Sequence, residues 1–211
     1  MTEMSTETSP TNAAEPSRWR RKAILAASAA VAAVALVGCK ADVISYELPA
    51  ESARYTFQTE TDGVTTAWEY TSDRPTEPDT PTSQPCIADV VLKETGPCRP
   101  EPLIFLRYDL GLGLDNTAEA GRLHPITVTG YYQDRIGTPP TVTELRAEAS
   151  FDGGKVWRPV STEAAGKNTF TARVKHPKRD RAPGGVALRI TATDRAGNTV
   201  KQTIPEAYRL R

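Results

Sequence analysis

The chain has 211 residues, and its 26 Lys and Arg balance 26 Asp and Glu, so the formal net charge is zero. This length allows one or two domains, and the zero net charge excludes a global positive field that would attract nucleic acid. The charge is unevenly distributed, because residues 40–148 carry 9 Lys and Arg against 18 Asp and Glu, whereas residues 149–211 carry 13 against 5. The middle of the chain is therefore acidic and its C-terminal third is basic.

The first 39 residues have the pattern of an export signal. Residues 1–22 are polar, end in a positive cluster and are expected to be a disordered cytoplasmic n-region. Residues 23–37 are apolar apart from Ser28, and as a helix they would span roughly 22 Å, short of the ~30 Å hydrocarbon core. Residues 23–39 are thus predicted to be a signal-peptide h-region, forming one signal or membrane helix, with the rest of the chain exported.

The apolar run ends in Leu36-Val37-Gly38-Cys39, which resembles the lipobox of bacterial lipoproteins. In that family the cysteine thiol receives a diacylglyceryl group, and the signal is cut just before the cysteine. The resemblance implies lipidation of Cys39 and a mature protein anchored to the extracytoplasmic face of the cell membrane. An uncleaved single-pass signal anchor and plain secretion stay open as alternatives.

The other two cysteines, Cys86 and Cys98, form an even pair once Cys39 is lipidated. They enclose a short segment with Pro and Gly, which suits a disulfide in an oxidising compartment. Such a bridge would contribute roughly 3 kcal/mol to stability. Two cysteines without a nearby His argue against metal ligation, so neither a metal nor a cofactor is expected.

Residues 40–102 predict a small β-unit with a Pro-rich loop. After a short tether, in which 43–46 could form a strand, residues 53–61 and 64–71 predict a hairpin around the turn Asp62-Gly63. Residues 72–85 are rich in Pro, Thr and acidic residues, so they are expected to be an exposed loop. Residues 87–93 predict a further strand.

Residues 103–211 predict a second β-unit. Its expected strands are 103–110, 125–132, 141–151, 155–160, 168–175, 186–193 and 199–204. In the closing hairpin, Val186, Leu188, Ile190 and Ala192 share one face, which is the period of a half-buried strand. The predicted fold class is all-β, an immunoglobulin-like or fibronectin-type β-sandwich preceded by the smaller β-unit.

Three strings resemble the C-terminal non-catalytic β-sandwich of secreted bacterial subtilisin-like serine peptidases. They are SFDGGKVWRPV (150–160), TFTARVKHP (169–177) and VALRITATDRAGNTVKQTIPEAYRL (186–210). Residues 53–73 and 103–130 are similar to the region that precedes this sandwich, so the resemblance covers roughly 53–211. Departures from the pattern are the Cys86–Cys98 segment and the inserted Lys178-Arg179-Asp180-Arg181.

Subtilisin-like enzymes need an Asp, a His in a Gly-His-Gly-Thr setting and a Ser in a Gly-Thr-Ser setting. Neither of these settings occurs in the chain, and both His124 and His176 are followed by Pro. The resemblance therefore implies the accessory module without the catalytic domain, and no catalytic residue is predicted. In those peptidases such modules act as spacers, stability elements and surface-binding modules.

Residues 150–157 also look like an Asp-box, the hairpin found in sialidase propellers, with Val156 in place of Thr. This box is a folding device in which the Asp accepts turn N–H groups, so Asp152 is expected to hold a turn and Trp157 to anchor the core. Sialidases carry several copies and an arginine triad, whereas this chain has a single copy.

The most basic run lies at 175–181, and its candidate anionic-surface patch consists of Lys175, Lys178, Arg179 and Arg181. It could be a solvated loop, or it could contact anionic envelope polymers or lipid headgroups. The run lacks interleaved aromatic residues, so nucleic acid is not an expected partner.

Four other titratable residues are expected to have structural or surface roles. Glu144 and Glu148 would lie roughly 13 Å apart on one strand, too far for a glycosidase pair, so they are interpreted as surface charges. Asp194 is interpreted as a turn cap rather than a calcium ligand. His124 and His176 are expected in loops.

The sequence thus predicts a non-catalytic, lipid-anchored envelope protein that acts as a binding or spacer module outside the membrane. Its expected partners are the membrane, through a lipid or signal anchor, and an envelope polymer or a protein such as a peptidase. The alternative is a detached accessory domain that binds or modulates a separate subtilisin-like serine peptidase.

Overall fold

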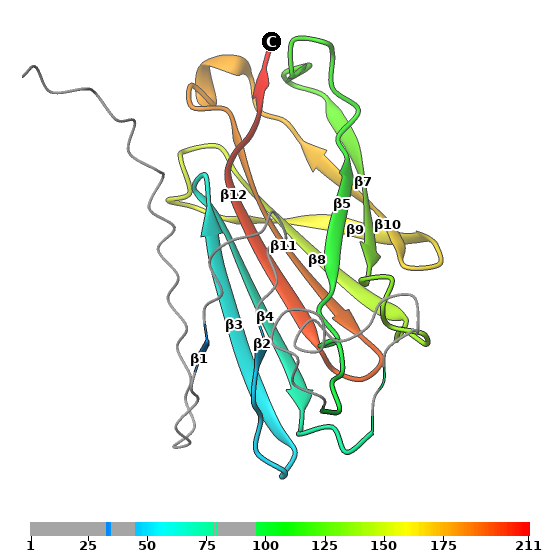
Figure 1. The fold of residues 1–211 in the computed structure, drawn as a ribbon. Coiled ribbons are helices and arrows are strands. Elements are labelled where there is room, and N and C mark those ends of the chain that lie inside the picture. Colours follow the sequence, from blue (N-terminus) through cyan, green and yellow to red (C-terminus); the bar gives the residue numbers. More distant parts are fainter. Residues whose placement is uncertain (1–32, 35–44, 78, 80–95) are drawn as a thin grey trace, which may run out of the picture.

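The structure, a computed structural model, describes residues 33–34, 45–77, 79 and 96–211 (Figure 1). Within these residues the fold is all-β, and the helical content is one 3₁₀ turn, η1 (Arg179–Arg181). The strands are β1 (Ala33–Val34), β2 (Ser45–Tyr46), β3 (Ala53–Thr61), β4 (Val64–Ser72), β5 (Phe105–Asp109), β6 (Thr117–Ala118), β7 (Leu123–Tyr131), β8 (Val142–Ser150), β9 (Arg158–Gly166), β10 (Thr169–Lys175), β11 (Val186–Asp194) and β12 (Thr199–Leu210).

Ten of these strands form one curled sheet. Its order is β3-β4-β12-β11-β8-β9-β10-β7-β5, and every ladder along this path is antiparallel. The short β6 pairs in parallel with the end of β12. Strand β9 joins the two halves, because it pairs with β8 on one side and with β10 on the other. The sheet therefore has two walls, β3-β4-β12-β11-β8 and β5-β7-β10, with the core between them.

Alternation of apolar residues places the core on the inner face of each wall. Strand β11 is the most buried element, since Leu188, Ile190 and Ala192 are each 0% exposed. From the opposite wall, Val128 on β7 and Ala172 on β10 are equally buried. The face predicted for 186–193 is confirmed by this pattern.

Polar side chains also tie the two walls together. Trp68 Nε1 on β4 donates to the carbonyl oxygen of Ile104, just before β5, at 2.7 Å. The Tyr108 hydroxyl on β5 donates to Gln202 Oε1 on β12 at 2.8 Å. Because buried polar groups need partners, these hydrogen bonds fix how one wall sits over the other.

The predicted hairpin around Asp62-Gly63 is confirmed. Asp62 and Gly63 have φ of 49° and 77°, the positive values of a type I′ turn, and Phe57 pairs directly with Trp68. The aromatic rings of this pair stack at a centroid distance of 5.5 Å. Strand β4 then pairs with β12, so the sheet runs on from the 40–102 segment into the 103–211 segment.

Several boundaries differ from the sequence predictions. Strand β9 begins at Arg158 rather than at 155, because the preceding residues form a tight turn around Asp152. Strand β12 continues to Leu210, well beyond the predicted end at 204, because a register shift lets its last residues pair with β6 and the start of β11. The parallel strand β6 was not predicted, since two residues carry no periodicity.

The expected signal or membrane helix at 23–39 is not supported where the structure describes it. Ala33 and Val34 form β1, whose backbone pairs with Ser45 and Tyr46 of β2. The remainder of 23–39 and the predicted strand at 87–93 lie outside the described residues.

We predict that Asp194→Ala lowers the free energy of unfolding by about 3 kcal/mol. The Asp194 carboxylate is 3% exposed and accepts hydrogen bonds from the Tyr132 hydroxyl, the Asn198 backbone N–H and the Asn198 side-chain amide. Its removal leaves these buried donors unpaired, which urea unfolding would measure.

Asp180→Ala is the matched control, because Asp180 is exposed in η1 and its carboxylate makes no hydrogen bond or ion pair with the rest of the described chain. Its effect should stay within about 0.5 kcal/mol. Equal destabilisation by both substitutions would contradict the role assigned to Asp194.

Candidate functional site at the basic end of the sheet

Three segments distant in sequence meet at one end of the molecule, which we call the basic end (the upper end in Figure 1). They are residues 175–185, the chain between β5 and β7, and the last residues of β12. Gly121 N donates to the carbonyl of Pro177 at 2.8 Å, and Arg209 and Leu210 pair with Thr117 and Ala118. The predicted patch is therefore part of a larger surface built from both walls.

The four predicted patch residues, Lys175, Lys178, Arg179 and Arg181, are all exposed. Their side chains make no ion pair with any other residue that the structure describes. Because no carboxylate neutralises them, their charges are available to an external anion.

Three further arginines that sequence reasoning missed also lie at the basic end. Each is paired with a carboxylate; the pairs are Arg122–Glu119 at 3.6 Å, Arg209–Glu206 at 2.7 Å and Arg211–Asp115 at 3.7 Å. These exposed pairs contribute little to stability. The pairing of β12 with β6, which no periodicity revealed, brings Arg209 and Arg211 to the patch, and the hydrogen bond from His176 N to the Arg122 carbonyl places Arg122 there.

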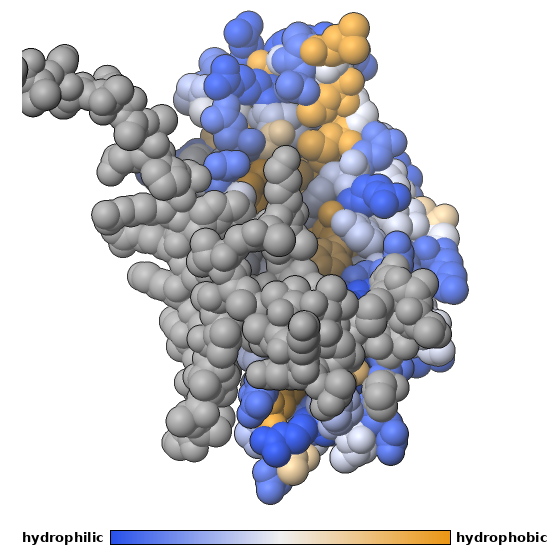
Figure 2. Space-filling model, viewed as in Figure 1, coloured by the Kyte–Doolittle hydropathy of each residue, from blue (hydrophilic) through white to orange (hydrophobic). Residues whose placement is uncertain are grey.

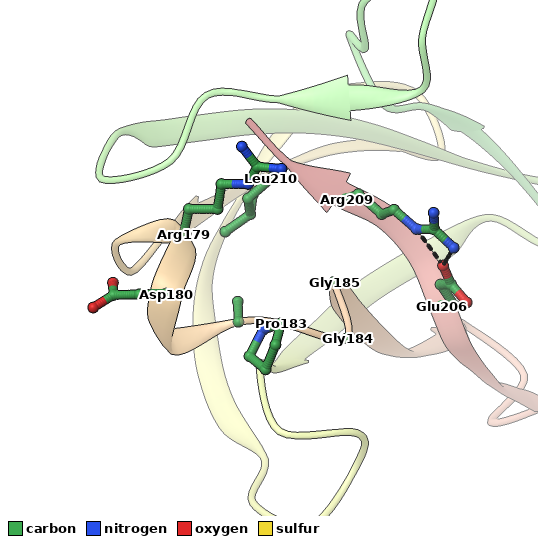
Figure 3. Close-up of a pocket in the computed structure, with 9 residues that line it drawn as sticks. Arg179, Asp180, Pro183, Gly184, Gly185, Glu206, Arg209 and Leu210 are labelled. Carbon is green, nitrogen blue, oxygen red and sulfur yellow. Dashed lines mark hydrogen bonds and ion pairs between the residues drawn. The ribbon is translucent and has the colours of Figure 1, made fainter.

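A hollow of about 810 Å³ opens between η1, the following loop and the end of β12 (Figure 3). Arg179 and Arg209 lie on opposite sides of it. Asp180 is also one of its lining residues, but its carboxylate points away from the hollow. The backbone of Gly185, with φ of 81°, forms part of its lining, where an added Cβ would lie 2.7 Å from the carbonyl oxygen of Tyr208. Since Arg209 is paired with Glu206, Arg179 is the cation of the hollow without a carboxylate partner.

A cluster of two histidines and a tyrosine lies beneath this surface. The rings of His124 and His176 stack at 5.0 Å between centroids, and His176 Nε2 is hydrogen-bonded to the Tyr208 hydroxyl at 2.9 Å. His176 Nδ1 lies 2.8 Å from the carbonyl oxygen of Glu119. His176 is 3% exposed, and this burial lowers its pKa, with His124 adding a smaller lowering effect.

The expectation that both histidines lie in loops is wrong for His124. It is part of β7, where it pairs with Val174, and its Nε2 contacts the carbonyl oxygen of Leu110 at 2.7 Å. The proline that follows each histidine does not end the local structure, because Pro125 is accommodated within the ladder opposite Arg173. His176 follows β10 directly, and its ring is packed rather than solvated.

The Asp-box prediction for Asp152 is confirmed. Asp152 Oδ1 accepts from the backbone N–H groups of Lys155 and Val156 at 3.0 and 2.9 Å and from the Ser150 hydroxyl at 2.8 Å. These donors, with that of Val156 first, lower the pKa of the Asp152 carboxyl. Asp152 is thus a turn-holding residue of the fold.

Trp157 is not a core anchor, contrary to the prediction. It is half-buried, and the Arg189 guanidinium lies 3.9 Å above its ring on the outer face of the sheet. The turn held by Asp152 carries Trp157 away from the core side. Arg189 also pairs with Glu148 at 3.3 Å, while Glu144 pairs with Arg146, so both glutamates are surface charges as predicted.

A second polar cluster, which sequence reasoning missed, lies where β4 ends. The Arg99 guanidinium contacts the Asp73 carboxylate at 2.7 Å and the Ser72 hydroxyl at 3.2 Å, and that hydroxyl donates to Glu101 Oε1 at 3.1 Å. Burial raises the pKa of Glu101. The cluster fastens residues 99–101 to β4, a structural role.

The predicted lipidation site Cys39 and the predicted disulfide partner Cys86 lie outside the described residues. Cys98 is described and is half-buried. Because its predicted partner Cys86 is not described, the Cys86–Cys98 pairing stays a prediction. Across residues 33–34, 45–77, 79 and 96–211, no group of three or more His, Cys, Asp or Glu is arranged to hold a metal ion. No helix in that part is long and apolar enough to cross a membrane.

Comparison of the chain with family models, with curated proteins and with solved structures finds no match.

We predict that the urea midpoint of unfolding falls as the pH is lowered from about 7.5 to about 5.5, and that it falls less in His176→Gln. Burial holds the folded-state pKa of His176 below 6.5, so the unfolded chain takes up a proton before the folded chain does. The stability is therefore fully present above the unfolded pKa and is lost as the pH falls through the window down to the folded pKa.

Glutamine cannot titrate, so the difference in pH slope between the two proteins isolates the imidazole of residue 176. Identical slopes would show that His176 does not carry this dependence.

Proposed function

We propose that the chain is a non-catalytic, lipid-anchored envelope protein that acts as a binding or spacer module on the extracytoplasmic face of the cell membrane. The anchor would be a lipid on Cys39, after removal of residues 1–38 as a signal. In this proposal the folded β-region carries out the binding, and its basic end is the binding surface.

An immunoglobulin-like or fibronectin-type sandwich is the fold we propose for residues 103–211. Support comes from the strand order, in which β5-β7-β10 forms one wall, β8-β11-β12 belongs to the other, and β9 joins them. Two antiparallel walls over one core, with neighbouring strands taken from distant parts of the chain, are the arrangement of such sandwiches. The β3-β4 hairpin extends the second wall at its β12 edge.

The observation that carries the binding proposal is the set of unpaired cations at the basic end. Lys178, Arg179 and Arg181 follow one another in a turn whose only acidic member, Asp180, points away from the hollow. Exposed cations contribute most binding free energy when they meet a dense array of negative charges, so an anionic polymer or surface is the partner that fits them.

The alternative function is an accessory domain that binds or modulates a separate subtilisin-like serine peptidase. It rests on the resemblance of residues 53–211 to the accessory region of those enzymes. Strands β3 and β5 end the sheet in the described chain, and such edges offer backbone groups to which another protein can pair. Copurification of a serine peptidase with a variant in which Lys178, Arg179 and Arg181 are replaced by Ser would favour this alternative.

We predict that Cys39 is the site of acylation. In cells supplied with a tagged fatty acid, the wild-type chain should carry the tag and Cys39→Ala should not, because only the sulfur of residue 39 stands at the end of the lipobox-like segment. Cys98→Ala is the control and should keep the tag. Unchanged tagging of Cys39→Ala would overturn the lipid anchor.

We predict that the full chain binds poly(glycerol phosphate) at low salt and that replacing Lys178, Arg179 and Arg181 together by Ser weakens this binding roughly 100-fold. Each basic residue near an anionic surface contributes about 1 kcal/mol, so three are worth about 3 kcal/mol. Titration of the fluorescently labelled polymer would give both dissociation constants.

The matched control is the triple replacement of Lys155, Arg158 and Lys167 by Ser. These residues are also exposed and carry the same charge, but they lie in β9 or in the turns that flank it rather than in the 175–185 run. Equal loss of binding in the two triple variants would mean that net charge, not this surface, determines binding.

A further inference from the structure

Two exposed leucines lie beside the cations of the basic end. The described residues include four large hydrophobic side chains that are mainly exposed; they are Leu114 at 109%, Leu123 at 59%, Val156 at 53% and Tyr131 at 40%. Leu114 stands in the loop between β5 and β6, and Leu123 begins β7. Figure 2 shows the same pattern, with hydrophobic atoms gathered at the upper end of the molecule next to hydrophilic ones.

The loop that carries Leu114 is held by its own hydrogen bonds. Asn116 N donates to the carbonyl of Gly113, and Gly113 N donates to the carbonyl of Thr117. The Asp115 carboxylate accepts from the Thr117 hydroxyl at 2.8 Å and pairs with Arg211. These hydrogen bonds hold the backbone of the loop without any packing of the Leu114 side chain. The side chain is therefore exposed to solvent at a fixed place.

Cations surround these leucines on both sides. Leu123 pairs across the ladder with Lys175, and the carbonyl of Arg122 accepts from His176 N. On the other side, Arg211 lies against Asp115, next to Leu114. The carboxylates of Glu119, Asp115 and Glu206 are each paired with an arginine, so the excess positive charge comes from the four unpaired patch residues. Among the described residues near them, the exposed carboxylates of Asp180 and Asp109 have no arginine partner.

Apolar side chains at a tip with Lys and Arg around them fit one kind of partner, the interface of an anionic lipid bilayer. There the leucines enter the boundary between headgroups and acyl chains while the cations contact lipid phosphates. A soluble anionic polymer would satisfy the cations but would leave Leu114 and Leu123 in water, which is why the lipid surface fits the whole patch better.

We propose that the basic end docks on an anionic membrane surface, with Leu114 and Leu123 inserted at the interface and Lys175, Lys178, Arg179 and Arg181 on the headgroups. This inference rests on the proposed function and names its anionic partner as the membrane itself. The module would then lie with this end against the bilayer rather than project freely from its anchor.

Hydrogen exchange of the full chain in vesicles tests this docking without a label. Backbone amides of residues 111–117 and 121–124 are compared in vesicles of phosphatidylcholine alone and in vesicles with ~30% phosphatidylglycerol. We expect these amides to exchange about tenfold more slowly with the anionic lipid, because docking removes the loop from water. Amides of β9 should exchange equally in both.

The double variant Leu114→Ser with Leu123→Ser separates insertion from simple charge attraction. It should lose most of the protection in anionic vesicles, whereas Val156→Ser, an equally exposed apolar residue in the Asp152 turn, should keep it. Equal exchange of wild type in the two lipid compositions, or full protection in the double variant, would overturn the inference.

The polymer titration distinguishes this failure from that of the proposed function. If the leucine variant and wild type show no lipid-dependent protection but the polymer still binds through Lys178, Arg179 and Arg181, only membrane docking is wrong. If removal of those three cations affects neither measurement, the basic end is not a binding surface at all.

Discussion

The closure of the two walls over one core depends on a buried carboxylate, Asp194. It accepts a hydrogen bond from the hydroxyl of Tyr132, which follows β7 in one wall. It also accepts from the Asn198 backbone N–H and so caps the turn between β11 and β12 in the other wall. Asn198 of the same turn accepts from Thr71 N at the end of β4, so the hairpin formed by β3 and β4 is tied to the same point. A carboxyl group at this depth is tolerated only because three donors replace its water.

This constraint explains why part of the core can be made of small side chains. Ala147, Ala149, Ala172 and Ala192 are all buried, and their small size lets the walls approach closely. Alanine contributes little apolar area, so packing by itself specifies the spacing of the walls weakly. The hydrogen bonds from Trp68 and Tyr108 to the opposite wall supply that specification, because each has one geometry in which it is satisfied.

The parts of the fold that sequence could predict are those determined by neighbouring residues. The Asp62-Gly63 turn, the alternation along β11 and the turn-holding role of Asp152 each depend on a few consecutive positions, and each is confirmed. The missed features depend on distant partners. His176 is hydrogen-bonded to Tyr208 and to the carbonyl of Glu119, and the Trp157 ring lies under Arg189. None of these partners is near its histidine or tryptophan in sequence.

The same distinction applies to the candidate site. Four of its cations lie within seven consecutive residues, 175–181, and could therefore be found in the sequence as a basic run. The rest of the surface comes from β12 and from the chain between β5 and β7, which contact that run only in the folded protein. The exposure of Leu114 and Leu123 could not be predicted, because an isolated leucine cannot be told from a core residue by sequence pattern. A strand-paired framework beneath them keeps the leucines and cations at one end, where a single flat partner can reach both kinds of side chain at once. The buried His124–His176–Tyr208 cluster supports that framework from below, so loss of its packing would disturb the docking surface before it reached the opposite end of the sheet.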